Sequence, residues 1–152
     1  MLKICLCSDN HGDIDSINKI LNDNPNCDYY LHAGDAMLDQ SYMGPFAMVL
    51  GNNDWDYDYP RQRILEIGGH RILILHGHGF TYSTNSLVEK AKQEKVDTVF
   101  FGHTHVFMDR TVAGIRLINP GSCFHNRDLS APCYCRVYIL DDGSIKVERI
   151  DL

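Results

Sequence analysis

Five short polar segments concentrate side chains that bind divalent metal ions, and each follows a run of apolar residues. The segments are Asp9-Asn10-His11, Gly34-Asp35, Gly51-Asn52-Asn53-Asp54, His76-Gly77-His78 and Gly102-His103-Thr104-His105. Carboxylates, neutral imidazoles and amide oxygens together suit Mn, Fe, Zn, Ni or Co better than Ca. These residue types therefore predict a site for transition-metal chemistry.

The spacing within and between the segments predicts that they meet. In Asp9-x-His11 and His103-x-His105, the two side chains are two residues apart and share one side of an extended backbone. In α/β proteins, the loops beyond the carboxyl ends of strands are where ligands collect. We expect all five segments to converge at one edge of the β-structure.

A strand-rich chain must position these segments. Apolar runs predict strands at residues 2–7, 28–32, 46–50 and 96–101, and hairpins at 63–75, 106–118 and 133–150. Helical spacing predicts helices at 13–23, with Asp13 as N-cap, and at 85–95. These helices are too few to link successive strands of a doubly wound sheet. We therefore expect two packed sheets with the helices outside.

Composition narrows the class of protein. The 152 residues fit one domain, residues 1–152. The net charge of −6 gives no support for general nucleic-acid binding. No apolar segment is long enough to cross a bilayer, and the N-terminal residues do not form a signal peptide. We therefore expect a cytoplasmic protein that does not bind membranes.

Six cysteines lie at positions 5, 7, 27, 123, 133 and 135. Two pairs have C-x-C spacing inside predicted strands, where neighbouring thiols bond to each other poorly. Reduced and mostly buried thiols are the better interpretation. A four-cysteine zinc site is an alternative that has no CxxC spacing in its favour.

The five segments, in this order, resemble the motifs of the calcineurin-like metallophosphoesterases: D-x-H, GD, GN-x, a lone H and GH-x-H. Asn119-Pro120-Gly121-Ser122 also resembles the turn after the site in the small bacterial and archaeal phosphodiesterases of that superfamily. The resemblance covers nearly the whole chain. It implies an α/β (α+β) fold of two stacked mixed β-sheets flanked by helices, the calcineurin-like metallophosphoesterase sandwich.

The resemblance also implies seven residues that hold two divalent metal ions and carry catalysis. The first ion would be held by Asp9, His11, Asp35 and His105. The second would be held by Asp35, Asn52, His76 and His103, with Asp35 as the bridge. Mn is the first expectation, with Fe, Zn, Ni, Co or Mg as alternatives. A metal-bridging hydroxide would attack phosphorus in line, and the Asn52 amide would help neutralise the phosphoryl oxygens.

The implied activity is hydrolysis of a small phosphate-ester substrate, with phosphodiesters expected first. Many superfamily members have His after GN, where this chain has Asn53. Asn53 cannot act as a general acid, which favours substrates with good leaving groups. Asp54, His78 and His125 are the alternative proton donors.

Other residues have competing interpretations. His32 fits a hydrogen-bonded core histidine, and His70 fits an exposed hairpin turn. His78 is either a substrate or supporting contact or an incidental loop residue. His125 and Arg127 fit the surface better than a phosphate contact. Residues 55–60, Trp-Asp-Tyr-Asp-Tyr-Pro, would either line a substrate rim or anchor a loop.

Two hypotheses compete with catalysis. One is a non-catalytic scaffold of the retromer-subunit type, which resembles this family but has a degenerate metal site. The other is regulatory binding of a nucleotide without turnover. The complete set of ligand residues, including His76, favours an enzyme. The sequence predicts no oligomeric state.

Overall fold

Two five-stranded β-sheets form the framework of the computed structural model, which describes residues 1–55, 58–80 and 83–152. The first sheet has the order β10-β9-β1-β2-β3 and the second β4-β5-β6-β8-β7. The first comprises β1 (Leu2–Cys7), β2 (Tyr29–His32), β3 (Ala47–Met48), β9 (Cys133–Ile139) and β10 (Ile145–Asp151). The second comprises β4 (Gln62–Ile67), β5 (His70–Leu75), β6 (Thr98–Phe100), β7 (Phe107–Val112) and β8 (Ile115–Pro120).

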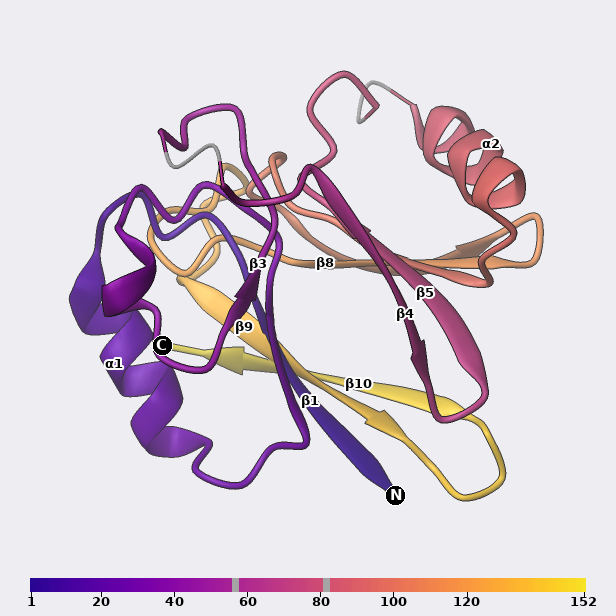
Figure 1. Ribbon diagram of the computed structural model, residues 1–152, viewed down its shortest axis with the longest axis horizontal. Coiled ribbons are helices and arrows are strands. Elements are labelled where there is room, and N and C mark those ends of the chain that lie inside the picture. The colour runs from indigo at the N-terminus through magenta and orange to yellow at the C-terminus, as the bar shows by residue number, and fades with distance from the viewer. Residues whose placement is uncertain (56–57, 81–82) are drawn as a thin grey trace.

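Both sheets mix parallel and antiparallel pairs. Strands β1, β2 and β3 run parallel, as do β5, β6 and β8, while β4, β7, β9 and β10 pair antiparallel with their neighbours. The loops that follow β1, β2, β5 and β6 gather at the upper edge of the molecule in Figure 1. The sheets thus bring the predicted metal-binding segments to one edge.

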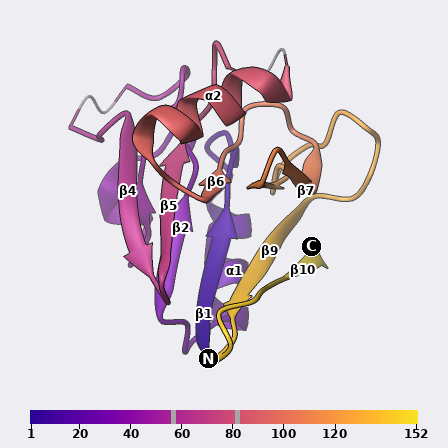
Figure 2. The same ribbon diagram turned by 90° about the vertical axis from the view of Figure 1, so that its right-hand side faces the viewer.

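The sheets stack face to face, with one helix on each outer side (Figures 1 and 2). Helix α1 (Ile14–Asp23) packs on the first sheet and α2 (Thr84–Glu94) on the second. A short 3₁₀ helix (Gln40–Tyr42) lies between β2 and β3. This arrangement confirms the predicted sandwich of two mixed sheets flanked by helices.

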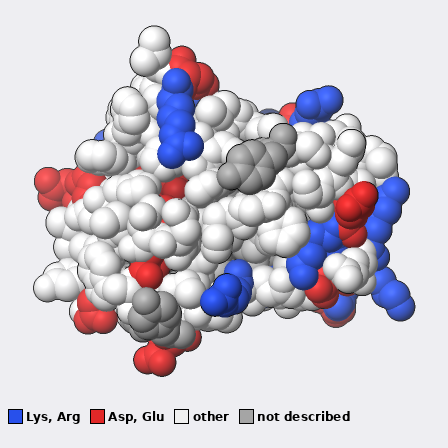
Figure 3. Space-filling model, turned by 90° about the horizontal axis from the view of Figure 1, so that it is seen from above, with Lys and Arg blue, Asp and Glu red and all other residues white. Residues whose placement is uncertain are grey.

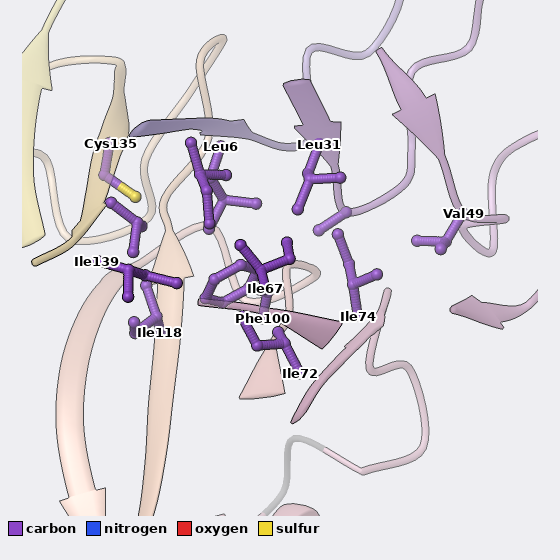
Figure 4. Packing of buried hydrophobic residues seen from close by; sticks show 13 residues of the cluster. Leu6, Leu31, Val49, Ile67, Ile72, Ile74, Phe100, Ile118, Cys135 and Ile139 are labelled. Atoms are coloured by element: carbon purple, nitrogen blue, oxygen red, sulfur yellow. The ribbon is translucent and has the colours of Figure 1, made fainter. Parts of the chain in front are cut away.

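The alternation of side chains along the strands divides the core into three clusters. Ile4 and Leu6 of β1 face the second sheet, whereas Cys5 and Cys7 face α1. In β5, Ile72 and Ile74 face the first sheet, and the intervening residues face α2. Figure 4 shows the contacts between the sheets, which include Phe100 and Ile118. Apolar residues on both faces are expected where helices cover a sheet.

Most predicted elements are present, with two corrections. Asp13 caps α1 by accepting a hydrogen bond from the Asp15 backbone N–H. Strand β3 is shorter than the predicted 46–50, because only Ala47 and Met48 pair with β2. The prediction that His70 lies exposed in a turn is wrong, since it begins β5. Its Nε2 lies 2.6 Å from the Gly143 carbonyl oxygen.

The cysteines behave as predicted, for all six are free and five of them are buried. Burial raises the pKa of the Cys5, Cys7 and Cys135 thiols well above the usual range. Among the described residues, no helix is long and apolar enough to cross a bilayer.

His32 is a core histidine, as predicted, and it joins β2 to the loops beyond it. Its Nε2 lies 2.9 Å from Asn10 Oδ1, and its Nδ1 accepts the Gly34 backbone N–H at 3.0 Å. Protonation would add a hydrogen to Nδ1 and break the second bond. Because His32 is completely buried, the charged form is disfavoured and its pKa falls to about 4.

The first prediction concerns the pH dependence of stability. Between about pH 6.5 and pH 4, unfolded His32 takes up a proton that folded His32 does not. The unfolded state therefore binds more protons, and acidification lowers the free energy of unfolding by roughly 3 kcal/mol over this range. Replacing His32 with Gln removes this pH-dependent contribution to the free energy of unfolding. Urea unfolding in chelator should show the stability advantage of the wild type over His32→Gln shrinking as pH falls, and parallel pH curves would contradict this account.

Candidate metal centre

Six of the seven predicted ligands meet where the loops beyond the strands converge. Asp9 and His11 follow β1, and Asp35 follows β2. His76 immediately follows β5, while His103 and His105 follow β6. Loops far apart in sequence thus lie together at one edge of the sheets (Figure 1), and their side chains form one polar cluster.

The Asp9 carboxylate lies at the bottom of this cluster and is fully buried. Its Oδ2 accepts hydrogen bonds from the Ser8 hydroxyl and from the His103 backbone N–H, at 2.5 and 3.0 Å. Its Oδ1 is buried without a hydrogen-bond partner among the described residues. Three imidazole nitrogens face this oxygen: Nε2 of His105 at 3.3 Å, of His11 at 3.8 Å and of His76 at 3.9 Å. A buried, unpaired carboxylate oxygen among imidazoles is what a divalent cation would satisfy.

Asp35 supplies a second carboxylate from the other side of the cluster. Its Oδ2 lies 3.3 Å from His76 Nε2 and 3.8 Å from His11 Nε2. Asn53 donates to both of its oxygens, from the backbone N–H to Oδ1 and from the side-chain amide to Oδ2, each at 2.9 Å. Asn53 thus orients the carboxylate that the sequence predicts as the bridge.

The imidazole rings are held in the orientation that metal ligands require. Nδ1 of His105 lies 2.8 Å from the His125 carbonyl oxygen, and Nδ1 of His76 lies 2.8 Å from that of Ala33. A carbonyl only accepts, so Nδ1 carries the proton in each ring and Nε2 is free to bind a metal.

Pairs of imidazole nitrogens also approach each other closely. Nε2 of His11 and of His105 are 3.0 Å apart, and Nδ1 of His103 lies 3.2 Å from Nε2 of His76. Two nitrogens bound tetrahedrally to one ion are about 3.3 Å apart, given metal–nitrogen bonds of about 2.0–2.1 Å. The observed separations are close to that value.

The electrostatics of the cluster favour ionised carboxylates. Burial raises the pKa of Asp9, but the neighbouring His105 and His11 imidazoles outweigh burial and hold it well below its usual range. In Asp35 burial is again outweighed, here by His76, and the pKa falls to about 2. The neighbouring Asp9 carboxylate raises the pKa of His11, whereas burial and the neighbouring His76 lower that of His103. Two carboxylates therefore stay charged at neutral pH.

Two groups of side chains could each hold one ion. One consists of Asp9, His11 and His105, and the other of Asp9, Asp35 and His76. Asp9 belongs to both groups, whereas the resemblance to the superfamily implies Asp35 as the bridge. Asn52, the seventh predicted ligand, has an exposed side chain on the loop between Gly51 and Asn53.

The backbone of the cluster departs from the extended conformation used to explain the D-x-H and H-x-H spacing. Five of the seven predicted ligands have positive φ angles: Asp9, His11, Asp35, His103 and His105, at 45–72°. This left-handed region is uncommon for residues with a Cβ atom, and residues held in it are enriched at functional sites. Tertiary hydrogen bonds hold it, as from His11 N–H to the Asp35 carbonyl oxygen at 3.1 Å.

Two glycines allow the backbone to approach the carboxylates. A Cβ atom at Gly51 would overlap Asp35 Oδ1, and one at Gly102 would overlap the Ser8 hydroxyl and Asp9 Oδ2. The glycines of GN and GH-x-H are therefore needed for the space they leave beside the ligands.

Asp54 joins the two loops that carry Asp35 and Asn52. Its Oδ2 accepts the Asp35 and Gly51 backbone N–H groups at 2.9 and 2.7 Å, and its Oδ1 accepts that of Met37 at 2.9 Å. A carboxylate with three backbone donors is held as an acceptor. These three bonds favour Asp54 as a structural acceptor over the predicted alternative role of proton donor.

The remaining candidates lie around the cluster. His78 is exposed, with its ring centroid 5.7 Å from that of His76, and burial followed by the charge of His76 lowers its pKa. His125 and Arg127 are exposed, as expected, and the Arg127 backbone N–H donates to the His105 carbonyl oxygen at 3.0 Å. Phe124, which the sequence did not single out, is 52% exposed beside His11.

The described residues of the aromatic segment 55–60 differ in their exposure. Tyr59 is buried in the α1 cluster and anchors the loop, whereas Trp55 is 57% exposed. Asp56 and Tyr57 lie outside the described residues.

Comparison with known proteins agrees with this geometry. The model of the calcineurin-like phosphoesterase superfamily domain matches residues 2–142. A relative named "Probable metallophosphoesterase MG207", from Mycoplasma genitalium, is 31% identical over 150 residues, 93% of this chain and 90% of that one. A crystal structure from Streptococcus pneumoniae TIGR4, described as a predicted phosphoesterase, superposes with a TM-score of 0.89 at 29% identity. It covers 99% of this chain and 89% of that one.

More distant structures share the fold alone. An archaeal phosphodiesterase has a TM-score of 0.75 at 21% identity, covering 98% of this chain and 100% of that one. Zinc-bound Vps29 from Entamoeba histolytica has a TM-score of 0.74 at 21% identity, covering 99% of each chain. The stacked mixed sheets and the carboxylate–histidine cluster at their edge define a metallophosphoesterase architecture. The chain belongs to the calcineurin-like phosphoesterase superfamily.

The second prediction tests the role of Asp54. Asparagine is nearly isosteric, but its NH₂ group would face backbone N–H donors on one side. Asp54→Asn should lower the free energy of unfolding of the metal-free protein by roughly 2–4 kcal/mol, because charge-assisted hydrogen bonds are lost. It should also weaken Mn²⁺ binding, since Asp35 is no longer fixed. Denaturant unfolding and calorimetric titration measure the two effects. Asp15→Asn, at an exposed position on α1, is the control, and indistinguishable behaviour of both variants would refute the role.

Proposed function

We propose that this protein hydrolyses phosphate esters, phosphodiesters first, with two divalent metal ions. The observation that carries the proposal is the buried, unpaired Asp9 Oδ1, which faces Nε2 of His11, His76 and His105. The Asp35 carboxylate, beside His11 and His76, supports the proposal as a second anionic ligand. The superfamily implies divalent metals, and this donor set fits them.

The proposed ligand sets are those implied by the sequence. Asp9, His11, Asp35 and His105 would hold one ion, and Asp35, Asn52, His76 and His103 the other, with Mn as the first candidate. Divalent ions held here would supply Lewis acidity toward phosphoryl oxygens and lower the pKa of bound water. The residues of the chain fix the geometry: Asn53 and Asp54 orient Asp35, and backbone carbonyls orient His76 and His105.

The surroundings of the centre support a substrate with a good leaving group. Asn53 is occupied in donating to Asp35, and Asp54 is occupied in accepting from the backbone. His78 and His125 remain the candidate proton donors: the His78 ring lies 6.3 Å from that of His103, and the His125 backbone carbonyl contacts His105. A phosphodiester with an acidic leaving group needs no such donor. The archaeal phosphodiesterase of similar fold is consistent with this substrate class.

A scaffold function is the second candidate, because Vps29 structures share the fold. The cluster of two carboxylates and four imidazoles favours an enzyme over a scaffold. Burying these polar groups destabilises the fold unless a bound cation compensates them.

The third prediction is the direct test of function. Chelator-stripped protein should be inactive toward bis(4-nitrophenyl) phosphate and should regain activity with Mn, Fe, Zn, Ni, Co or Mg. 4-Nitrophenyl phosphate, assayed alongside, measures the preference for diesters. Calorimetry should find two metal equivalents in the wild type. Asp35→Ala should disturb both sites, whereas Asp39→Ala, at an exposed position, is the control.

Two outcomes would contradict this proposal. Absence of hydrolysis with every metal would reject the enzymatic function. Tight binding of two equivalents by Asp35→Ala would reject Asp35 as the bridge. If Asp9→Ala alone lost both sites, the bridge would belong to Asp9, which is shared by both groups of donors.

The fourth prediction concerns the leaving group. With Asn53 in place of a histidine, the rate should depend steeply on leaving-group pKa, so that aryl diesters react well and alkyl diesters poorly. A positioned general acid contributes roughly 10²–10⁴-fold, so its absence is measurable. The measurement is log rate against leaving-group pKa at saturating metal, with Asn53→His as the comparison. A flat plot for the wild type would reveal a proton donor, and its loss in His78→Ala or His125→Ala would identify which residue that is.

A further inference from the structure

A cavity of about 220 Å³ adjoins the metal centre on the side of α2. It lies between the start of β4, the end of β5 and the helix, and its wall includes Arg61, Leu75, His78, Phe80 and Lys90. His76, a proposed metal ligand, lines it as well. A molecule bound at the metals could therefore extend into this cavity without leaving the protein surface.

The cationic groups of the cavity are available to a ligand. Arg61 is exposed, and no described residue forms an ion pair or a hydrogen bond with its guanidinium. Lys90 Nζ lies 3.0 Å from Glu94 Oε1, which uses one of its three donors. His78 lies between the cavity and the centre, with its ring 5.7 Å from that of His76 and 6.3 Å from that of His103. Figure 3 shows Lys and Arg side chains, mixed with acidic ones, over the α2 part of this face.

The size of the cavity limits what it can hold. Pockets for drug-sized ligands are roughly 300–1,000 Å³, so this one suits a single small group. Two cations and the neighbouring imidazole favour an anion, and the planar fork of arginine matches the oxygens of a phosphate. Phe80 and Leu75 add apolar surface for the carbon atoms that connect such a group to the reacting phosphate.

We propose that this cavity binds a second phosphate group of the substrate. The inference rests on the proposed function and narrows its substrate class to phosphodiesters that carry another phosphate on an ester arm. Arg61 and Lys90 bind that phosphate, and His78 lies along the path between it and the metal centre.

A larger cavity, of about 370 Å³, is a poorer site for the same group. It is lined by His70, Asp97 and Arg116, among others, and Arg116 is already paired with Asp109 at 2.9 Å. His70 begins β5 and His76 follows its end, which places this cavity roughly 20 Å from the centre along the strand. No arm of a small substrate spans that distance.

The fifth prediction uses two probes that differ by one phosphate. They are thymidine 5′-(4-nitrophenyl phosphate) and the same compound with a 3′-phosphate. The wild type should hydrolyse the second with a kcat/KM about tenfold higher, the effect expected of one or two charge-assisted hydrogen bonds. Arg61→Gln and Lys90→Gln should bring the ratio of the two kcat/KM values toward one, and Arg61→Lys should retain part of it.

Matched controls remove the same charges outside the cavity. Arg110→Gln, on β7, and Lys92→Gln, on α2, both at exposed positions, should keep the wild-type ratio. Circular dichroism checks that every variant is folded. A wild-type ratio near one, or an equal loss of the ratio in the control variants, would overturn the inference.

A binding measurement separates this inference from the proposed function. Calorimetry compares thymidine 3′,5′-bisphosphate with thymidine 5′-monophosphate on metal-loaded protein. In one outcome neither ester is hydrolysed, the bisphosphate binds about tenfold tighter, and Arg61→Gln abolishes this difference. The cavity is then a phosphate site, and the phosphodiesterase proposal fails. If both esters are hydrolysed alike and both nucleotides bind alike, the cavity proposal fails and the enzymatic function stands.

Discussion

Two carboxylates, Asp9 and Asp35, are removed from water within reach of the same imidazole rings. Each buried charge costs several kcal/mol unless donors or cations compensate it. The protein supplies donors for three of the four carboxylate oxygens, through Ser8, Asn53 and backbone N–H groups. The fourth oxygen is left to the imidazoles that surround it. The positions of the loops, the glycines and the ring orientations all follow from holding these two anions close together.

Such a cluster needs a framework that can bear its cost. A left-handed conformation at a residue with a Cβ atom costs about 1–3 kcal/mol, and the cluster contains five such residues. The Asp54 carboxylate fixes one of them through the Asp35 backbone N–H. Three apolar clusters, one between the sheets and one beneath each helix, provide the compensating stability. The stability of these three apolar clusters thus offsets the unfavourable free energy of the metal centre.

The sequence predicted the parts of this structure that local pattern determines. Apolar runs separated by turn residues predicted the hairpins, and the order of five motifs predicted which side chains would meet. Contacts set by tertiary structure were missed. Asp54 follows Gly51-Asn52-Asn53 in sequence, but its bond to the backbone of Asp35, 19 positions away, has no local signal. The same holds for His70, whose partner Gly143 lies on the turn between β9 and β10.

The two-residue spacing of Asp9 and His11 correctly predicted that they lie in one cluster, but an extended backbone is not what brings them together. Residues two apart share a side of an extended strand, yet Asp9 and His11 are in left-handed turns beyond β1. What brings them together is the hydrogen bonding of their loop to residues 34–36. Asp and His adopt positive φ more often than most residues with a Cβ atom, but at these positions the tertiary hydrogen bonds hold it.

Strand β1, which begins at Leu2, is the middle strand of the first sheet and pairs on one side with β9. Its partner begins at Cys133, so most of the chain must be available before the sheet can close. Pairings of this separation carry a large loop-closure entropy and slow the folding of domains that depend on them. The segment that carries Asp9 therefore stays exposed and unpaired on one edge until late in folding. On a ribosome, β1 emerges well before β9, so this apolar strand is without its partner while the residues between them are synthesised, which exposes it to aggregation during that time.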